Sequence, residues 1–390
     1  STRMDLGSMP PIASRLLDRS GWKEVKSKAM VPVVELDGRV LSFLDLFLVN
    51  CERLSRATGT SCPALLLVSE ANAGEIESYV ESRGASGLTV MSFRQSLDRQ
   101  IVATAEDVER AGKNFASDAD AESALAISRA FAGHSLDVRK PAGHGEFLHQ
   151  LISSGTLGRL LERGVRYVSI RNIDNVGATL DADWLAILGR MIATQRLFTL
   201  EVSRRPDGPA GKGGALILRP GGRFQIAEDP SFAGTGVSAR DSYYINDATA
   251  ILDVGLLFRI YETSAAEIRS ASAAGLAAVA DRGRGKFPPL LDVKPVRLSS
   301  GRIAGAFIRE TNLWESTGVV EGEGVDALGV LSVKDVEEGF EARSADEQRE
   351  LAERVRFLAT KKWEDYEGVN ARLVPHLARR VVSGRLVEEA

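Results

Sequence analysis

The chain has 390 residues, of which 44% are hydrophobic and 26% are charged, and its formal net charge is −4. This balance is ordinary for a globular protein, and the length allows one large domain or two to three medium ones. The mild acidity argues against a general nucleic-acid surface or an anionic-membrane surface, because both need a basic field. We therefore expect no nucleic-acid partner and no membrane partner, and any phosphate site must be a local pocket.

Cysteine usage and the apolar runs indicate the compartment. The two cysteines, Cys51 and Cys62, cannot form a disulfide framework, which points to a reducing cytosol. The longest apolar run, near residues 273–280, is far shorter than the roughly 20 residues that span a bilayer. Residues 1–30 contain no apolar segment of the kind found in signal peptides. We expect a cytoplasmic protein in which Cys51 packs as a small apolar residue on a helix.

Short apolar runs alternate with helical patterns, which is typical of βα units around a largely parallel sheet. The expected strands are 64–69, 88–92, 166–171 and 198–203. The expected helices, with apolar residues three and four positions apart, are 43–58, 73–82, 147–163 and 183–194. Gly-rich and Pro-rich stretches then bracket short strands at 214–218 and 224–227, which predicts β-hairpin insertions. An Ala-rich helix is expected at 264–280, and the charged residues from 344 onward predict further helix.

The most informative stretch is residues 140–178. It contains a Gly-His-Gly loop at 143–145, an amphipathic helix, and a strand followed by Asn172, Asp174 and Asn175. Ligands of open α/β sheets bind at the carboxyl ends of strands, and an Asp between amides suits a hard cation that bridges phosphates. The alternative is that Asp174 and Asn175 only cap a turn, as these residue types often do.

This stretch resembles the UTP:sugar-1-phosphate uridylyltransferases of the eukaryotic UDP-glucose pyrophosphorylase type. Their pattern is P-P-G-H-G-D, then S-G-x-L-x-x-L-L-x-x-G-x-x-Y, then N-x-D-N-L-G-A. The corresponding residues here are Pro141–Glu146, Ser154–Tyr167 and Asn172–Ala178. Weaker similarities follow the family's order over residues 25–315: Lys28, Ser42–Leu46, Phe93–Ser96, Glu201–Val202, Lys212–Gly214, Ile245–Asn246, Lys294 and Glu310–Thr311.

The resemblance implies an α/β fold with a Rossmann-like, mainly parallel nucleotidyltransferase sheet flanked by helices, with β-hairpin insertions. It implies a catalytic domain over residues 1–315, and it leaves 316–390 as a mostly helical C-terminal appendage. The implied reaction is Mg²⁺-dependent transfer of UMP from UTP to a sugar 1-phosphate, with glucose 1-phosphate as the favoured acceptor. A phosphate oxygen is already a nucleophile, so the protein must mainly hold two polyanions and neutralise growing charge.

Roles follow from the resemblance for each matched residue. The implied metal ligand is Asp174, and the implied catalytic lysines, which contact phosphates, are Lys294 and Lys28. The implied nucleotide-binding residues are Gln95 at the uracil edge, Gly143, Gly145, Thr2 and Arg3. The implied sugar-phosphate-binding residues are His144, Asn172, Gly214, Asn246 and Lys212. The alternative for Lys28 and Lys212 is a solvated surface cation, and His134, His149 and His376 are expected to be structural.

Departures from the family pattern leave alternatives open. Residues 1–7 resemble only the tail of the family's glycine-rich nucleotide loop, so either the sequence begins inside that loop or the loop is lost. Residues 246–249 replace the family's N-T-N-N, which keeps N-acetylglucosamine 1-phosphate and galactose 1-phosphate open as substrates. A non-catalytic relative that binds nucleotide sugars is the remaining alternative, and the oligomeric state is not predicted.

Overall fold

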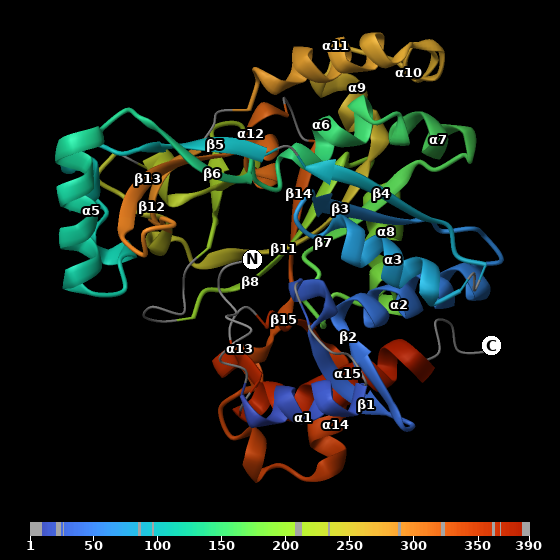
Figure 1. Cartoon of the computed structure of the whole chain (residues 1–390). Helices are drawn as coiled ribbons and strands as arrows, with labels where there is room; N and C mark the ends of the chain where they lie inside the picture. Colours follow the sequence, from blue (N-terminus) through green and yellow to red (C-terminus); the bar gives the residue numbers. More distant parts are fainter. Residues whose placement is uncertain are drawn as a thin grey trace.

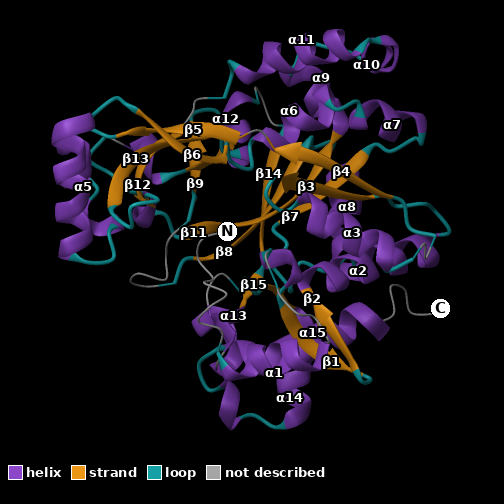
Figure 2. Ribbon diagram, viewed as in Figure 1, coloured by secondary structure: helices purple, strands orange, loops and turns teal. Residues whose placement is uncertain are grey.

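The computed structural model describes residues 10–20, 25, 27–84, 87–95, 97–206, 213–232, 235–287, 290–320, 324–360, 363–366 and 368–383. Helices and strands alternate along most of the chain, and helices flank the sheets (Figures 1 and 2). The α/β class expected from the sequence is confirmed.

The central sheet has the order β10-β9-β11-β8-β14, and β7 pairs with β11. Its strands are β7 (Tyr167–Arg171), β8 (Phe198–Arg204), β9 (Ala215–Arg219), β10 (Arg223–Ala227), β11 (Tyr244–Asp253) and β14 (Val325–Gly329). Strands β8 and β14 are parallel, whereas β11 is antiparallel to β7, β8 and β9. Strands β7, β8 and β14 therefore point in one direction, and the long strand β11 makes the sheet mixed. The expected hairpin insertion is the antiparallel pair β9 and β10.

A second sheet is antiparallel and has the order β12-β13-β5-β6. Its strands are β5 (Leu97–Val102), β6 (Ser135–Pro141), β12 (Leu290–Arg297) and β13 (Ile303–Glu310). Helices α4 (Ala105–Arg110) and α5 (Asp118–Phe131) accompany it, with α5 packed on β13 at the left of Figure 1. Strands β3 (Ala64–Ser69) and β4 (Val90–Gln95) form a separate parallel pair beside α3 (Ala73–Ser82).

Local sequence signals explain where the helices begin and end. Helix α2 (Phe43–Thr58) has the expected bounds, because Ser42 and Asp45 form a reciprocal capping box and Gly59 ends the helix with φ of 62°. The single helix expected over 147–163 is two helices, α6 (Glu146–Ser153) and α7 (Thr156–Glu162). They are separate because Gly155 between them has φ of 73°, in the left-handed region.

The remaining helices cover the sheets. Helix α8 (Ala182–Ala193) follows β7, and α9 (Val254–Ile260) follows β11. The Ala-rich segment is also two helices, α10 (Ala265–Ser270) and α11 (Ala273–Arg284), because Ser272 N-caps the second one. Helix α12 (Ser316–Val319) follows the second sheet.

The two ends of the chain pack on each other, as the lower part of Figure 1 shows. The N-terminal elements are α1 (Pro11–Ser20), β1 (Pro32–Leu36) and β2 (Arg39–Ser42). The C-terminal elements are β15 (Leu331–Ser332), α13 (Val333–Val336), α14 (Ala345–Arg354), β16 (Val355–Phe357) and α15 (Gly368–Ser383). Leu44 and Leu48 share one buried cluster with Leu373 and Leu377, and β14 lies in the central sheet. Residues on both sides of the expected boundary at 315/316 therefore share a sheet and a core.

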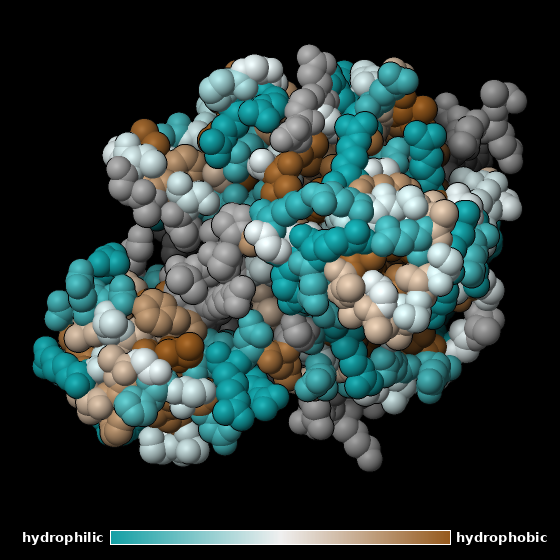
Figure 3. All heavy atoms as spheres, turned by 90° about the horizontal axis from the view of Figure 1, so that it is seen from above, coloured by the Kyte–Doolittle hydropathy of each residue, from teal (hydrophilic) through white to brown (hydrophobic). Residues whose placement is uncertain are grey.

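The molecular face viewed in Figure 3 is mostly hydrophilic, with hydrophobic residues in small areas between the polar ones. No helix among the described residues is long and apolar enough to cross a membrane. Cys51 is buried on α2, as expected, and burial raises the pKa of its thiol to about 12.

Candidate active site

Asp174 lies in the loop after β7 and forms an ion pair with Lys28. The Lys28 ammonium donates a hydrogen bond to Asp174 Oδ2, and the two side chains are 12% and 10% exposed. Lys28 opens a single turn of 3₁₀-helix that Ser27 caps by accepting a hydrogen bond from the backbone N–H of Ala29. Lys28 is therefore no solvated surface cation, and two residues singled out from distant parts of the sequence are in contact.

The second carboxylate oxygen of Asp174, Oδ1, is buried and has no hydrogen-bond partner among the described residues. A buried oxygen of this kind is available to a ligand. No group of three or more His, Cys, Asp or Glu side chains within the described part of the chain could hold a metal ion by itself. Mg²⁺ is often held by one or two carboxylates together with substrate phosphates, so Asp174 fits such an ion when phosphates are present. Mg²⁺ itself stays a prediction.

The predicted nucleotide loop is built at the start of α6. The Gln95 side-chain amide, at the end of β4, donates a hydrogen bond to the Gly143 carbonyl. Gly143 has φ of 99°, which a side chain would disfavour. A Cβ on Gly145 would lie 2.6 Å from the carbonyl carbon of Thr311, so only glycine fits there. Gln95, Gly143 and Gly145 are thus brought together, and each glycine has a steric reason.

Thr311 ties this loop to the end of the second sheet. The Gly145 amide donates to the Thr311 carbonyl at 2.8 Å, and the Thr311 amide donates to the Ala142 carbonyl at 2.8 Å. His144 Nδ1 accepts a hydrogen bond from the Leu313 amide at 3.2 Å, and the His144 ring lies 6.1 Å from the ring of Trp314. His144 is therefore held by the segment after β13, and its sugar-phosphate role stays a prediction.

Three of the predicted sugar-phosphate-binding residues lie on β11 or contact it: Asn172, Asn246 and Gly214. The backbone N–H of Asn172 donates to the Ala248 carbonyl at 3.3 Å, and the backbone N–H of Asn246 donates to the Gly214 carbonyl at 3.0 Å. The pairing of β11 with β8 shifts register between Asn246 and Thr249, and Ala248 has φ of 55° within this bulge. A Cβ on Gly214 would lie 2.7 Å from Glu228 Oε1. Asn246 and Gly214 are therefore in direct contact, and Asn172 contacts Ala248, two positions after Asn246. All four hydrogen-bonding groups belong to the backbone.

The remaining predicted site residues are elsewhere. Lys294 is half-buried on β12, opposite Ala306 of β13, and so belongs to the second sheet, whereas Asn246 lies in the central sheet and Asp174 follows a strand of that sheet. Its predicted phosphate contact stays a prediction. Thr2, Arg3 and Lys212 lie outside the described residues.

The sequence reasoning missed a buried group of charges beside this site. Arg356, on β16, is 4% exposed and donates to both carboxylate oxygens of Glu201, at 2.8 and 3.1 Å. It also donates to Asp181 Oδ1 at 3.1 Å. The signal was present in the short apolar run Val355–Leu358, which is interrupted by one Arg and follows a charged helix. A charge inside a buried strand requires an opposite charge nearby. Glu201, which lies within the apolar strand expected at 198–203, was a candidate for that opposite charge.

His149 is structural, as expected. Its Nδ1 is hydrogen-bonded to the Tyr261 hydroxyl at 2.6 Å, and its ring is fully buried against Phe287. Burial lowers the pKa of His149 to about 4, because the charged imidazolium is disfavoured away from water.

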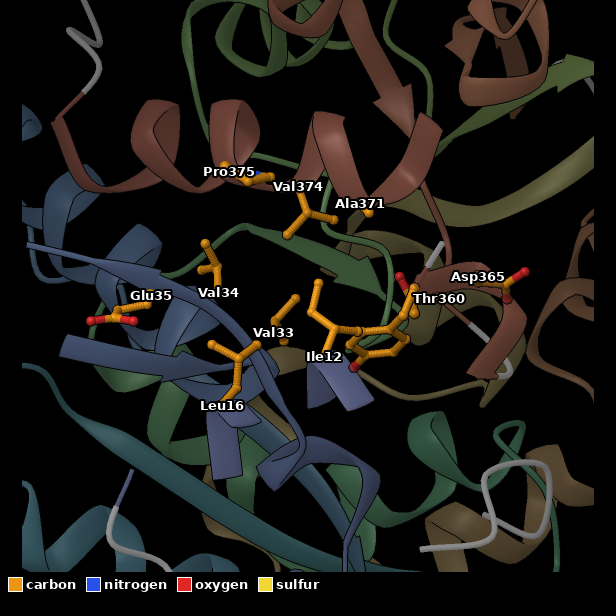
Figure 4. Close-up of a pocket in the computed structure, with 11 residues that line it drawn as sticks. Ile12, Leu16, Val33, Val34, Glu35, Thr360, Asp365, Ala371, Val374 and Pro375 are labelled. Atoms are coloured by element: carbon orange, nitrogen blue, oxygen red, sulfur yellow. The ribbon is translucent and has the colours of Figure 1, made fainter. Parts of the chain in front are cut away.

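A cavity of about 180 Å³ lies between α1, β1 and α15 (Figure 4). Apolar side chains form most of its wall, among them Ile12, Leu16, Val33 and Val374. Small-molecule sites typically measure about 300–1,000 Å³, so this cavity is too small for a nucleotide sugar. It also contains none of the predicted site residues.

Comparison with known protein families gives one match over half of the chain. The family described as UTP–glucose-1-phosphate uridylyltransferase matches residues 21–232. A protein of that name from Musa acuminata is 32% identical over 187 residues, which are 48% of this chain and 35% of the relative. Its counterpart from Hordeum vulgare is 31% identical over 188 residues, which are 48% of this chain and 34% of the relative. The match thus spans about a third of the length of these curated relatives.

Solved structures of low sequence identity share the fold. A UDP-glucose phosphorylase from Trypanosoma brucei aligns with a TM-score of 0.57 at 18% identity, over 88% of this chain and 62% of the other. A variant of UDP-glucose pyrophosphorylase from Leishmania major, in complex with UDP-glucose, aligns with a TM-score of 0.56 at 17% identity, over 94% and 68%. A putative UDP-N-acetylglucosamine pyrophosphorylase from Entamoeba histolytica aligns with a TM-score of 0.53 at 15% identity, over 89% and 74%.

Proposed function

Because the chain belongs to the UTP–glucose-1-phosphate uridylyltransferase family, we propose that it transfers UMP from UTP to a sugar 1-phosphate, with glucose 1-phosphate as the favoured acceptor. The products are a UDP-sugar and pyrophosphate. The observation that carries the proposal is the buried Lys28–Asp174 ion pair at the carboxyl end of β7. It joins a cation suited to phosphate and a carboxylate suited to Mg²⁺ at the edge of the sheet where α/β proteins bind ligands.

Different residues of the chain would bind and orient the two polyanionic substrates, UTP and the sugar 1-phosphate. Gln95 offers an amide donor and a carbonyl acceptor, which match the edge of uracil, and its side chain contacts the Gly143 loop from the end of β4. Lys28 pairs with Asp174 and would contact phosphate when this carboxylate holds a cation. Mg²⁺, when bound at Asp174, supplies Lewis-acid stabilisation of the charge that develops on the α-phosphate. No side chain needs to act as a general base, because the attacking phosphate oxygen is already anionic.

A second sugar 1-phosphate is the alternative acceptor, and one observation favours it. Asp247 is buried and accepts a hydrogen bond from Ser203 Oγ at 2.6 Å, and Ala248 follows it in the β11 bulge. Compared with the family's N-T-N-N segment, Asn246 is kept, a buried carboxylate replaces the Thr, and Ala248 and Thr249 replace the two later amide side chains. This change at the predicted sugar end supports a different hexose, such as N-acetylglucosamine or galactose 1-phosphate.

Initial rates of pyrophosphate release test the proposal directly. UTP is paired in turn with the 1-phosphates of glucose, galactose and N-acetylglucosamine at fixed Mg²⁺. We expect the highest kcat/KM with glucose 1-phosphate and background rates without an acceptor. A preference for one of the other sugars would replace the favoured acceptor by the alternative one. Background rates with all three would contradict the uridylyltransferase proposal and favour a chain that only binds nucleotide sugars.

A further inference from the structure

A short segment from the C-terminal part of the chain holds Asp174 and the two residues that follow it. We call residues 356–360 the strap. The Val176 amide donates to the Leu358 carbonyl at 3.0 Å, and the Thr360 amide donates to the Asp174 carbonyl at 3.0 Å. The Leu358 amide donates to the Asn175 side-chain oxygen at 3.0 Å. The segment from Asp174 to Val176 is therefore held by residues more than 180 positions later in the sequence.

The glycine of the Asn172–Ala178 motif has its steric reason in the strap. A Cβ on Gly177 would lie 2.7 Å from the carbonyl carbon and 2.7 Å from the carbonyl oxygen of Arg356. Real Cβ atoms do not approach backbone so closely, so the position requires glycine as long as the strap is in place. The motif therefore contains a residue whose identity depends on a segment outside the matched family region, which ends at residue 232.

Arg356 anchors the strap. Its guanidinium donates to both oxygens of Glu201, to Asp181 Oδ1 at 3.1 Å and to the Thr179 carbonyl at 3.4 Å. Burial alone would lower the pKa of Arg356, but the carboxylates of Glu201 and Asp181 outweigh burial and the net pKa is raised. The planar fork of arginine can donate two N–H groups to one carboxylate and still reach a second one, whereas an ammonium is a compact point charge without this fixed geometry.

A second arginine supports the same cluster from α15. Arg380 donates to Thr179 Oγ1 at 2.7 Å and lies 3.5 Å from Asp181 Oδ2. It also donates to the Gly177 carbonyl at 3.3 Å and the Val355 carbonyl at 3.4 Å. These contacts join Val355, the residue before the strap, to the loop that follows Asp174.

From these contacts we infer that Arg356 is a positioning residue for uridylyl transfer, which acts by clamping the strap against the Asp174 loop so that the carboxylate keeps one orientation. The inference rests on the proposed function for the reaction, but the clamp itself is a property of the fold. Supporting residues that orient a metal ligand typically change metal affinity or activity by about 10-fold to 100-fold when they are replaced.

The test uses Arg356→Lys in the full chain, with Arg83→Lys as the matched control. Arg83 is also a mostly buried arginine with two carboxylate partners, Asp45 and Glu52, but these partners belong to α2 and not to the strap or the Asp174 loop. Two quantities are measured for each protein: amide hydrogen exchange of Val176, Leu358 and Thr360, and the Mg²⁺ concentration that gives half-maximal pyrophosphate release.

In Arg356→Lys we expect the three strap-linked amides to exchange about 10-fold faster, while amides of β13, in the second sheet, keep their rates. We expect the Mg²⁺ requirement to rise about 10-fold, and Arg83→Lys to leave both quantities at wild-type values. Wild-type exchange at the strap, or faster exchange with an unchanged Mg²⁺ requirement, would overturn the positioning role.

If Arg356→Lys does not fold, Arg380→Lys is measured in the same way, because it loosens the same cluster from α15. If the wild-type chain is inactive with every sugar 1-phosphate, the proposed function fails. The hydrogen-exchange data then show independently whether Arg356 holds the strap against the Asp174 loop, since they require no turnover.

Discussion

Lys28 and Asp174 are 146 residues apart in the sequence, yet the Lys28 ammonium donates directly to a carboxylate oxygen of Asp174. The pair is almost buried, so each charge depends on the other for compensation. The contact brings the N-terminal segment to the carboxyl end of β7. It also places a cation next to the one carboxylate that the family resemblance assigns to the metal.

Replacing Lys28 by Met tests how much this ion pair contributes to the stability of the fold. The change leaves Asp174 as an uncompensated, nearly buried charge, and we expect a loss of about 3 kcal/mol in the free energy of unfolding at neutral pH. Urea denaturation measures this loss. Lys334→Met is the control, because Lys334 is exposed in its ion pair with Glu337 and its loss is expected to cost less than about 0.5 kcal/mol. Equal stability of Lys28→Met and wild type would show that the ion pair is not formed in solution.

Gln95→Ala tests the nucleotide end of the site. The Gln95 amide reaches the Gly143 loop, where the resemblance places uracil, so its loss is expected to reduce the preference for UTP over CTP. A lost pair of hydrogen bonds typically changes discrimination by about 10-fold or more. Competition between the two nucleotides in the pyrophosphate assay measures the ratio of kcat/KM values. Gln348→Ala, on α14, is the control, and an unchanged UTP preference in Gln95→Ala would remove its uracil role.

Ala248→Gly tests the bulge in β11. Ala248 has φ of 55°, where a side chain is disfavoured, so glycine is expected to stabilise the chain by about 1 kcal/mol. Ala250→Gly in the same strand is the control, because it has ordinary strand geometry and is expected to destabilise. Thermal unfolding of both variants measures the effect. A destabilised Ala248→Gly would mean that the strained backbone is not the native one.

His149 predicts a pH dependence of stability. Its pKa is lowered from an unfolded value of about 6.5 to about 4 by burial, so between these values the unfolded chain binds a proton that the folded chain does not. This contribution to stability is complete above the unfolded pKa and is lost as pH falls toward the folded pKa. We expect it to amount to about 2 kcal/mol between about pH 7 and pH 5.

Urea denaturation of wild type and His149→Gln at both pH values isolates this contribution from that of the carboxylates. We expect the variant to be less stable at neutral pH, because the Tyr261 contact changes, but to lose less stability on acidification. An identical pH dependence in the two proteins would contradict the buried, neutral His149.

Local sequence signals predicted the elements that depend on local physics. The helix over 43–58 and the strand over 64–69 have the expected bounds, because a capping box, a C-terminal glycine and an uninterrupted β-branched and leucine-rich run each act within a few residues. The prediction of one helix over 147–163 was wrong, because the structure has two helices there. Gly155 between them adopts a left-handed conformation, which the spacing of apolar residues does not reveal.

Contacts between residues far apart in the sequence could not be predicted from it. The motif predicted that Asp174 and the Gly143 loop matter, but not that Lys28 would neutralise Asp174 or that Arg356 would meet Glu201 across 155 positions. Nor did periodicity show that β11 would run antiparallel in the central sheet. Such pairings are decided by which buried charges and strand edges compensate each other in three dimensions.

The most direct measurement of the central claim compares UTP binding and turnover in wild type and Asp174→Asn. Asp326→Asn is the control, because Asp326 is similarly buried and ion-paired but belongs to β14. We predict that Asp174→Asn binds UTP within about threefold of wild type by titration calorimetry and loses at least about 100-fold in kcat, because a metal ligand acts chiefly on the transition state. Wild-type turnover in Asp174→Asn would contradict the assignment of the β7 loop as the catalytic centre.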